Sequence, residues 1–134
     1  MSERNLEVVA RGYAHFAQTG DVLEEISDPD FVWDMSTFRG WPEQKCYSGP
    51  EGTRRFLSDW TESWEDWKLE IVELVDAGGD LVLAICHQSG RSKATGLVVE
   101  MDFAQLWTVR DGLQLRMRMY ADPAEARREA GLTD

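Results

Sequence analysis

Two polar side chains occupy positions at which the sequence predicts an apolar interior. Tyr13 lies on the apolar stripe of a segment with helical spacing, and Asp34 lies in the short apolar segment Phe-Val-Trp-Asp-Met. A buried phenol or carboxylate costs free energy unless the group is paired or used. Burial raises a carboxyl pKa by up to ~3–5 units, which suits proton transfer near neutral pH. We therefore predict that both side chains face one chemical pocket. The alternatives are a core tyrosine with its hydroxyl at the surface, and an aspartate that caps the next loop through Ser36 or Thr37.

Composition and charge limit the classes of partner. The chain has 134 residues, of which 43% are hydrophobic, and a net charge of −11, which fits one folded domain spanning residues 1–134. Such an acidic surface repels nucleic acid and anionic membranes, so we expect neither as a partner. No signal peptide or membrane span is evident. Cys46 and Cys86 lie outside any metal-ligand spacing, and no other group has such spacing, so we expect reduced thiols, no metal and a cytoplasmic protein.

Hydrophobic periodicity predicts helices in the first half of the chain and strands in the second. The predicted helices cover about residues 3–19, 21–28, 48–64 and 122–131. The predicted strands cover about residues 31–36, 67–77, 81–88, 97–109 and 113–120. Helices early and strands late are typical of an α+β domain in which a curved antiparallel sheet wraps around the helices. The open end of such a cone is a natural pocket.

Several segments together carry a family resemblance. They are Tyr13 on the helix stripe with Thr-Gly-Asp after the helix, FVWDM, YSGPEGTRRFL, the Gly-Gly hairpin and the ending FAQLWTVRDGLQLRMRMYADPAEA. Over essentially the whole chain they resemble the SnoaL-like polyketide cyclase and ketosteroid-isomerase-like branch of the nuclear transport factor 2-like superfamily. The resemblance implies a cone-shaped, cystatin-like α+β barrel. The superfamily includes enzymes of several reaction types and also proteins without activity. The resemblance therefore specifies the fold more closely than the reaction.

The resemblance also implies roles for particular residues. Tyr13 corresponds to the isomerase tyrosine that donates a hydrogen bond to the substrate oxygen, and Asp34 corresponds to the general base. Ketosteroid isomerase has a second, protonated aspartate in its oxyanion hole. Here that position is Ala104, while Asp102 lies two residues earlier on the same strand face. This departure favours a polar pocket with different hydrogen bonding over steroid isomerisation.

The last strand and its neighbours leave alternatives open. Alternation puts Gln114, Arg116, Arg118 and Tyr120 on one face and Leu113, Leu115, Met117 and Met119 on the other. The resemblance places Arg118 and Tyr120 inside the cone, whereas the residues alone favour the Met/Leu face as core. An exposed Met/Leu face would need cover, so we expect a homodimer.

Other side chains allow both a structural and a functional interpretation. His87 shares a strand face with Leu83 and Ile85; it is either a satisfied core residue or, as the resemblance implies, a cavity residue. Trp33 and Trp60, with Trp41, either pack in the core or wall the mouth of the cone for a planar ligand.

The sequence therefore predicts a small enzyme of the isomerase, cyclase or hydrolase type that needs no cofactor and binds a small hydrophobic, carbonyl-bearing ligand. Asp34 would abstract a proton next to the carbonyl, Tyr13 would bind the enolate oxygen, and Asp102, His87 and Arg118 would orient the ligand. The alternative is a non-catalytic ligand-binding or dimerisation module. A third interpretation is water activation by Asp34, Asp102 and Arg118, as in the epoxide hydrolases of the superfamily.

Overall fold

A six-stranded sheet with helices on both faces forms the structure, a computed structural model that describes residues 2–38 and 46–132. In chain order the elements are α1 (Ser2–Thr19), a 3-10 turn (Glu24–Ile26), β1 (Ser27–Asp34), β2 (Cys46–Ser48), α2 (Gly49–Thr61), β3 (Trp64–Gly78), β4 (Leu81–Ser92), β5 (Val98–Arg110), β6 (Leu113–Tyr120) and α3 (Pro123–Glu129). None of the described helices is long and apolar enough to span a membrane.

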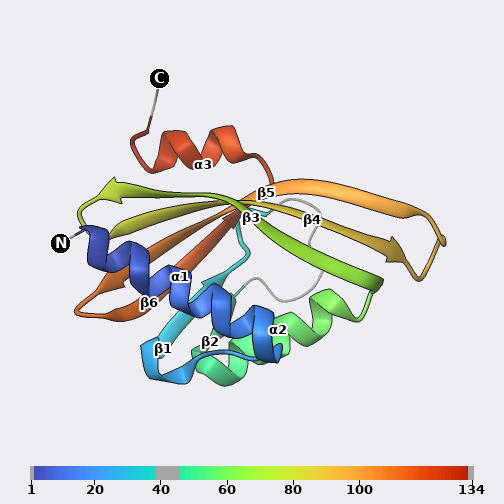
Figure 1. The fold of residues 1–134 in the computed structure, drawn as a ribbon, viewed down its shortest axis with the longest axis horizontal. Coiled ribbons are helices and arrows are strands. Elements are labelled where there is room, and N and C mark those ends of the chain that lie inside the picture. Colours follow the sequence, from blue (N-terminus) through green and yellow to red (C-terminus); the bar gives the residue numbers. More distant parts are fainter. Residues whose placement is uncertain (1, 39–45, 133–134) are drawn as a thin grey trace.

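The strand order of the sheet is β2-β1-β6-β5-β4-β3. Only the β1–β6 pair is parallel, and the other pairs are antiparallel. The sheet is curved, with α1 and α2 on one face and α3 on the other (Figure 1). We call these the inner face and the outer face. The predicted α+β cone is therefore confirmed.

Three local predictions differ from the structure. The expected helix at 21–28 is only a three-residue 3-10 turn, because Leu23 before it is extended (φ −89°, ψ 95°). The short strand β2 was not predicted; its three residues pair with the end of β1. The segment 89–92 was expected in a connection, but it continues β4. Its residues pair with the start of β5, from Ser89 opposite Glu100 to Arg91 opposite Val98.

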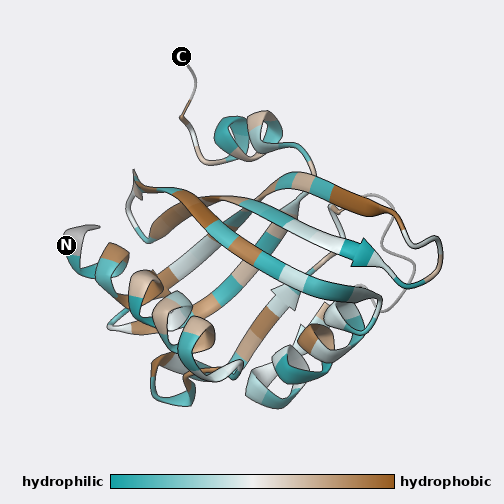
Figure 2. Cartoon of the chain, turned by 45° about the vertical axis from the view of Figure 1, so that its right-hand side comes forward, coloured by the Kyte–Doolittle hydropathy of each residue, from teal (hydrophilic) through white to brown (hydrophobic). Residues whose placement is uncertain are grey.

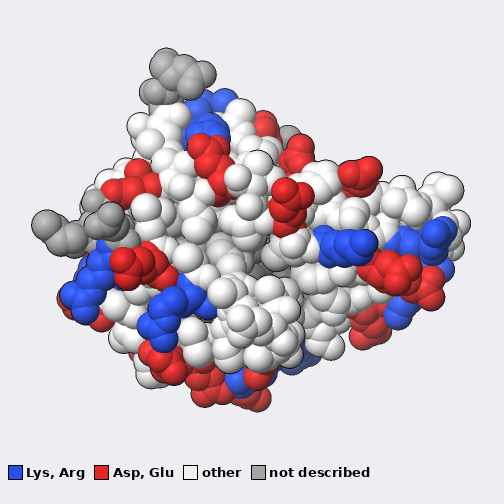
Figure 3. Space-filling model, viewed as in Figure 1, with Lys and Arg blue, Asp and Glu red and all other residues white. Residues whose placement is uncertain are grey.

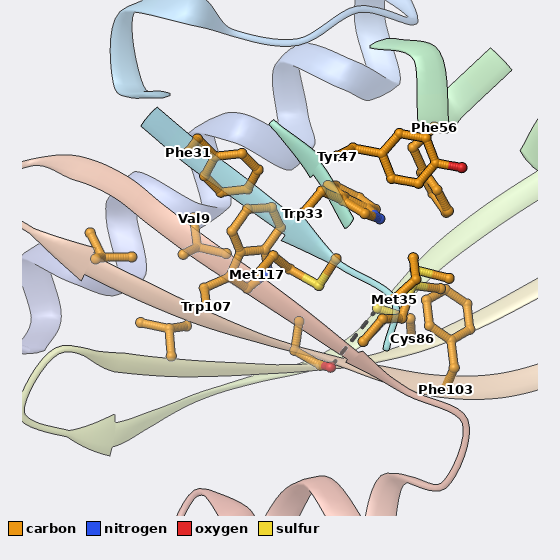
Figure 4. Close-up of a cluster of buried hydrophobic side chains, with 14 of the residues drawn as sticks. Val9, Phe31, Trp33, Met35, Tyr47, Phe56, Cys86, Phe103, Trp107 and Met117 are labelled. Carbon is orange, nitrogen blue, oxygen red and sulfur yellow. Dashed lines mark hydrogen bonds between the residues drawn. The ribbon is translucent and has the colours of Figure 1, made fainter. Parts of the chain in front are cut away.

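The main core lies between the inner face and the two long helices. Period-2 alternation turns Phe31 and Trp33 of β1 inward, and Trp107 of β5 and Met117 of β6 meet them beside Val9 of α1 (Figure 4). Burying each such side chain stabilises the fold by about 1.5–3 kcal/mol. Figure 2 shows the matching alternation of hydrophilic and hydrophobic residues along the helices. This packing holds α1 and α2 against the sheet.

A smaller cluster covers part of the outer face. Ala126 and Ala130 of α3 pack there on Leu83, Leu106 and Tyr120. The helix begins at Asp122, whose carboxylate accepts the N–H of Ala124 at 2.9 Å, and Pro123 occupies its first turn. The last helix therefore serves as a cap on the sheet.

A β-bulge changes which side chains of β6 face inward. Thr108 pairs with Arg116 but Val109 pairs with Gln114, so Leu115 is the extra residue. The bulge brings Gln114 to the inner face, as a residue lining the cavity described below.

The two faces of β6 correct the placement that the resemblance implied. Met117 and Met119 belong to the inner core, while Tyr120 packs under α3 and Arg118 pairs with Asp34 on the outer face. The expectation that Arg118 and Tyr120 lie inside the cone is therefore wrong. The methionine face that was expected to need a partner subunit is covered within the chain, and the homodimer stays a prediction.

Stability of the outer cluster tests the role of α3. Replacing Ala126, which is fully buried, by Asp (Ala126→Asp) places an unpaired carboxylate in an apolar contact, and we expect a loss of about 3 kcal/mol in the free energy of unfolding. The matched control is Ala124→Asp on the exposed side of the same helix, which should change stability by less than about 0.5 kcal/mol. Urea unfolding measures both. Equal stability of the two variants would show that α3 does not pack on the sheet.

Candidate functional site

An apolar cavity lies between the inner face of the sheet and the helices α1 and α2. Its volume is about 90 Å³, and residues of both helices and of β1, β3, β5 and β6 line it. A water molecule needs roughly 10–15 Å³ of such space. Since a cavity of about 150 Å³ takes benzene, a ring-sized ligand needs this cavity together with the groove described below.

Aromatic rings form much of the cavity wall. Trp33 and Phe56 lie with ring centroids 4.6 Å apart, and Phe31 stacks on Trp107 at 6.0 Å. Trp60 and Trp67 complete this wall, and one buried amide fixes both: Oε1 of Gln88 accepts their indole N–H groups at 2.8 and 3.0 Å. These rings are rigidly held and suited to a flat, apolar molecule.

A wider groove leads from the cavity to the surface. It shares Tyr13, Phe16, Leu57 and Trp67 with the cavity and runs between the end of α1, α2 and β3. Arg54 lies at its edge and forms ion pairs with carboxylates of the α1–β1 connection, including Asp21 at 2.7 Å. The face that carries α1 is largely uncharged at its middle, with charged side chains around the edge (Figure 3).

The Tyr13 hydroxyl reaches the cavity from α1 and is fully engaged. It accepts the indole N–H of Trp107 at 2.9 Å and donates to Oε1 of Gln105 in a short hydrogen bond. Burial, and then the nearby Cys86, raise the pKa of Tyr13 well above its usual value. Burial also raises the pKa of Cys86 to about 12. Both groups therefore stay neutral, and Tyr13 acts as a hydrogen-bonding group.

Asp34 lies on the outer face, away from the cavity. Its neighbours Trp33 and Met35 point inward, so alternation turns Asp34 outward. The residue is 1% exposed. Its carboxylate accepts the N–H of Ser36 at 2.8 Å, Nη2 of Arg116 at 2.5 Å and Nε of Arg118 at 3.4 Å.

These partners decide the ionisation of Asp34. Burial raises the pKa of the carboxyl, but the hydrogen bonds from Ser36 and Arg116, with the positive charge of Arg116, outweigh burial. They hold the pKa of Asp34 well below its usual value. The predicted common pocket for Tyr13 and Asp34 is therefore wrong: the two side chains lie on opposite faces of the sheet.

His87 and Asp102 also lie on the outer face. Nδ1 of His87 is 2.6 Å from Oδ1 of Asp102, and Nε2 is 3.0 Å from Oε1 of Glu100. The hydrogen bond to Asp102, and then the one to Glu100, raise the pKa of His87 above its usual value. His87 is thus a satisfied surface-facing residue, and Asp102 pairs with it rather than with Arg118.

Of the predicted site residues, the structure brings Tyr13, Trp33 and Trp60 to the cavity. It places the others on the outer face: Asp34, His87, Asp102, Arg118 and Tyr120. Trp41 lies outside the described residues.

The sequence interpretation missed Gln105, a polar residue of the cavity wall. The signal was present in the alternation of the strand predicted at 97–109, because Gln105 shares a face with Phe103 and Trp107. A lone amide between two aromatic residues on a buried face needs a partner, which Tyr13 supplies.

Comparison with known proteins identifies the family. Residues 8–117 match the family model of the SnoaL-like domain, so the chain belongs to the SnoaL-like family. The predicted family resemblance is thereby confirmed. A search of curated protein sequences finds no match.

Solved structures agree on the fold. TerC co-crystallised with polyporic acid has a TM-score of 0.73 and 22% identity, over 96% of this chain and 98% of that chain. An NTF2-like protein from Burkholderia thailandensis E264 has a TM-score of 0.76 and 22% identity, over 92% and 95%. A ketosteroid-isomerase-like protein from Catenulispora acidiphila DSM 44928 in complex with trimethylamine has a TM-score of 0.69 and 16% identity, over 95% and 94%. At these identities the likeness shows the fold alone.

The pairing of Asp34 predicts a pH-dependent stability. The pKa of Asp34 is lower in the folded protein than its value of about 3.9 in the unfolded chain, so its ionisation stabilises the fold at pH values above about 3.9. This contribution is lost as the pH falls through the pKa of the folded protein. We expect Asp34→Asn to be less stable than the wild type by about 2 kcal/mol at pH 7. The difference should shrink as the pH falls from about 4 to 2.

The measurement is chemical unfolding of both proteins across this pH range. Asp30→Asn is the matched control, because Asp30 is exposed on the same strand, and it should show no such pH-dependent difference. A stability difference for Asp34→Asn that stays constant down to low pH would contradict the ion pairing.

Proposed function

We propose that this protein binds a small, planar, largely apolar and uncharged molecule in the cavity, which the ligand reaches through the groove. The observation that carries the proposal is the cavity itself, walled by aromatic rings from five elements and containing uncharged amide and hydroxyl groups. Such a site, mostly apolar with a few placed polar groups, is typical of small-molecule binding. Tyr13, Trp33 and Trp60 are the predicted residues that take part.

The charges around the cavity favour a neutral ligand. Among the described lining residues the only ionisable carboxylate is Asp21, which lies where the cavity meets the groove and pairs with Arg54. A charged ligand would lose its hydration without gaining a counter-charge inside. Two structures of the same fold were crystallised with small molecules, polyporic acid and trimethylamine, which supports a ligand-binding role.

The geometry supports ligand binding better than proton abstraction by Asp34. That carboxylate is on the other face of the sheet and is neutralised by Arg116. Water activation by Asp34, Asp102 and Arg118 gains no support either, because Asp102 is held by His87. Any carbonyl chemistry in the cavity would depend on hydrogen bonds to the ligand oxygen rather than on this carboxylate.

A blocked passage tests the binding site. Leu57 lines both the cavity and the groove, so Leu57→Trp should narrow the passage between them. Acetophenone serves as the probe, with ligand-observed NMR as the measurement. We expect the wild type to bind it with a Kd of about 0.1–1 mM, near 0.5 kcal/mol per non-hydrogen atom. Leu57→Trp should weaken binding at least about ten-fold, since the ring cannot enter a filled passage.

The matched control makes the same change far from the cavity. Leu97 is 66% exposed near the β4–β5 turn, so Leu97→Trp should bind acetophenone as the wild type does. Equal binding by both variants would place the ligand elsewhere.

A second measurement separates Asp34 from the site. Asp34→Asn, checked to be folded by circular dichroism, should bind acetophenone with the wild-type Kd, because the carboxylate lies across the sheet from the cavity. A ten-fold weaker affinity in the folded variant would return Asp34 to the binding site.

A further inference from the structure

The hydrogen bonds inside the cavity run in one direction. The indole N–H of Trp107 can only donate, so the oxygen of Tyr13 must accept it. The single phenolic proton then goes to Oε1 of Gln105. This fixes the orientation of the amide, with its oxygen toward Tyr13 and its nitrogen as the end of the chain. Tyr13 has no second proton for a ligand.

The amide nitrogen of Gln105 is poorly satisfied. Among the described residues its only hydrogen-bond partner is the thioether sulfur of Met119 at 3.8 Å, and sulfur is a weak acceptor. Gln105 is 5% exposed and lines the cavity. A buried amide N–H without an oxygen acceptor is destabilising and uncommon in folded proteins.

A second donor of the cavity wall has no partner at all. The indole N–H of Trp33 is buried without any hydrogen-bond partner in the part of the chain that the structure describes. Trp33 is 5% exposed and also lines the cavity. Gln105 and Trp33, two residues that line the cavity, thus each carry a donor without an oxygen acceptor among the described residues.

We propose that the ligand presents an uncharged oxygen acceptor of the carbonyl class to Nε2 of Gln105, so that Gln105 rather than Tyr13 contacts this oxygen. The inference rests on the proposed binding function and specifies its ligand class. Tyr13 and Trp107 are positioning residues, because they hold the amide with its N–H groups directed away from them. Each hydrogen bond in such a chain polarises the next, which strengthens the last donor.

The same geometry selects against other ligand classes. A hydroxyl or amine that needs to donate has to share Oε1 of Gln105 with Tyr13, whereas an acceptor meets an amide N–H whose partner is only a sulfur. A carboxylate finds no cation among the described residues that line the cavity, since Arg54 lines only the outer groove. A neutral ketone, by contrast, needs only the free donor.

A matched ligand pair tests the proposal. Acetophenone and α-methylstyrene have nearly the same planar shape and differ in C=O against C=CH2. Their Kd values are measured for the wild type and for Gln105→Leu, and the ratio of the two values is compared between the proteins. This comparison cancels the different hydration of the two ligands. We expect Gln105→Leu to shift the ratio at least about five-fold toward the hydrocarbon. Gln18→Leu, an exposed control on α1, should leave it unchanged.

Tyr13→Phe tests the positioning role. Loss of the phenol frees the amide to turn, so the ratio of the two Kd values should shift in the same direction as for Gln105→Leu. Acetophenone labelled with carbon-13 at the carbonyl gives a readout that does not depend on Gln105→Leu folding. Its carbonyl resonance should lie further downfield when bound to the wild type than when bound to Tyr13→Phe.

The outcomes separate the inference from the proposed function. If neither ligand binds the wild type, the binding function fails and the inference with it. If both ligands bind but the ratio of their Kd values is the same in the wild type and Gln105→Leu, the cavity binds ligands without a hydrogen bond from Gln105 to a carbonyl oxygen. Only the inference is then overturned. A bound carbonyl resonance at the same position in the wild type and in Tyr13→Phe would overturn it as well.

Discussion

The attachment of α1 to the inner face of the sheet depends on the hydrogen bonds of the Tyr13 hydroxyl. Its hydrogen bonds to Trp107 and Gln105 tie the helix to β5 inside an otherwise apolar space. Gly12 makes the close approach possible, because a Cβ there would lie 3.2 Å from Cδ1 of Ile26 and 3.3 Å from Nε2 of Gln114. A Cβ there would require these two side-chain ends to shift by a few tenths of an ångström. The cavity thus lies where hydrogen bonds of the Tyr13 hydroxyl, in addition to packed hydrocarbon, join the helix to the sheet.

The two faces of the sheet divide the chemistry of the molecule. The outer face carries the ionised groups, of which Asp34 is buried between Arg116 and Arg118, and His87 is held between two carboxylates. Ion pairs of this kind keep the carboxylate charged and occupied, which suits a structural role. The inner face keeps its polar groups neutral: an amide and a phenol that cannot ionise near pH 7. A ligand in the proposed site would therefore be bound through hydrogen bonds between uncharged groups.

The sequence predicted the fold more reliably than the site, for a physical reason. Long periodic segments identify helices and strands whatever their neighbours, and the segments around Tyr13 and Trp107 formed as expected. Which face of a strand turns inward depends on single residues. One extra residue at Leu115 moved Gln114 to the inside. The apolar neighbours of Asp34 led to the prediction that its side chain lies inside. Those neighbours do point inward, and alternation along the strand therefore turns Asp34 outward. The hydrogen bond from Ser36 was among the alternatives that the sequence offered, but the two arginine partners come from β6, more than eighty positions away, where no local pattern shows them.

The resemblance aligns Ala104 with the second, protonated aspartate of ketosteroid isomerase, and the place of Ala104 in the sheet shows what an acid there could reach. Ala104 is fully buried on the outer face under α3, so an acid there would not reach the cavity in this chain. The next residue, Gln105, lies on the cavity side of the strand. The ability of its amide N–H to donate a hydrogen bond does not depend on a protonation equilibrium. A protonated acid donates only while its pKa stays high, whereas an amide donates at every pH. A cavity built on Gln105 can therefore hold a neutral oxygen over a wide pH range. Asp21, the carboxylate among the described residues that line the cavity, is held by Arg54 where the cavity meets the groove.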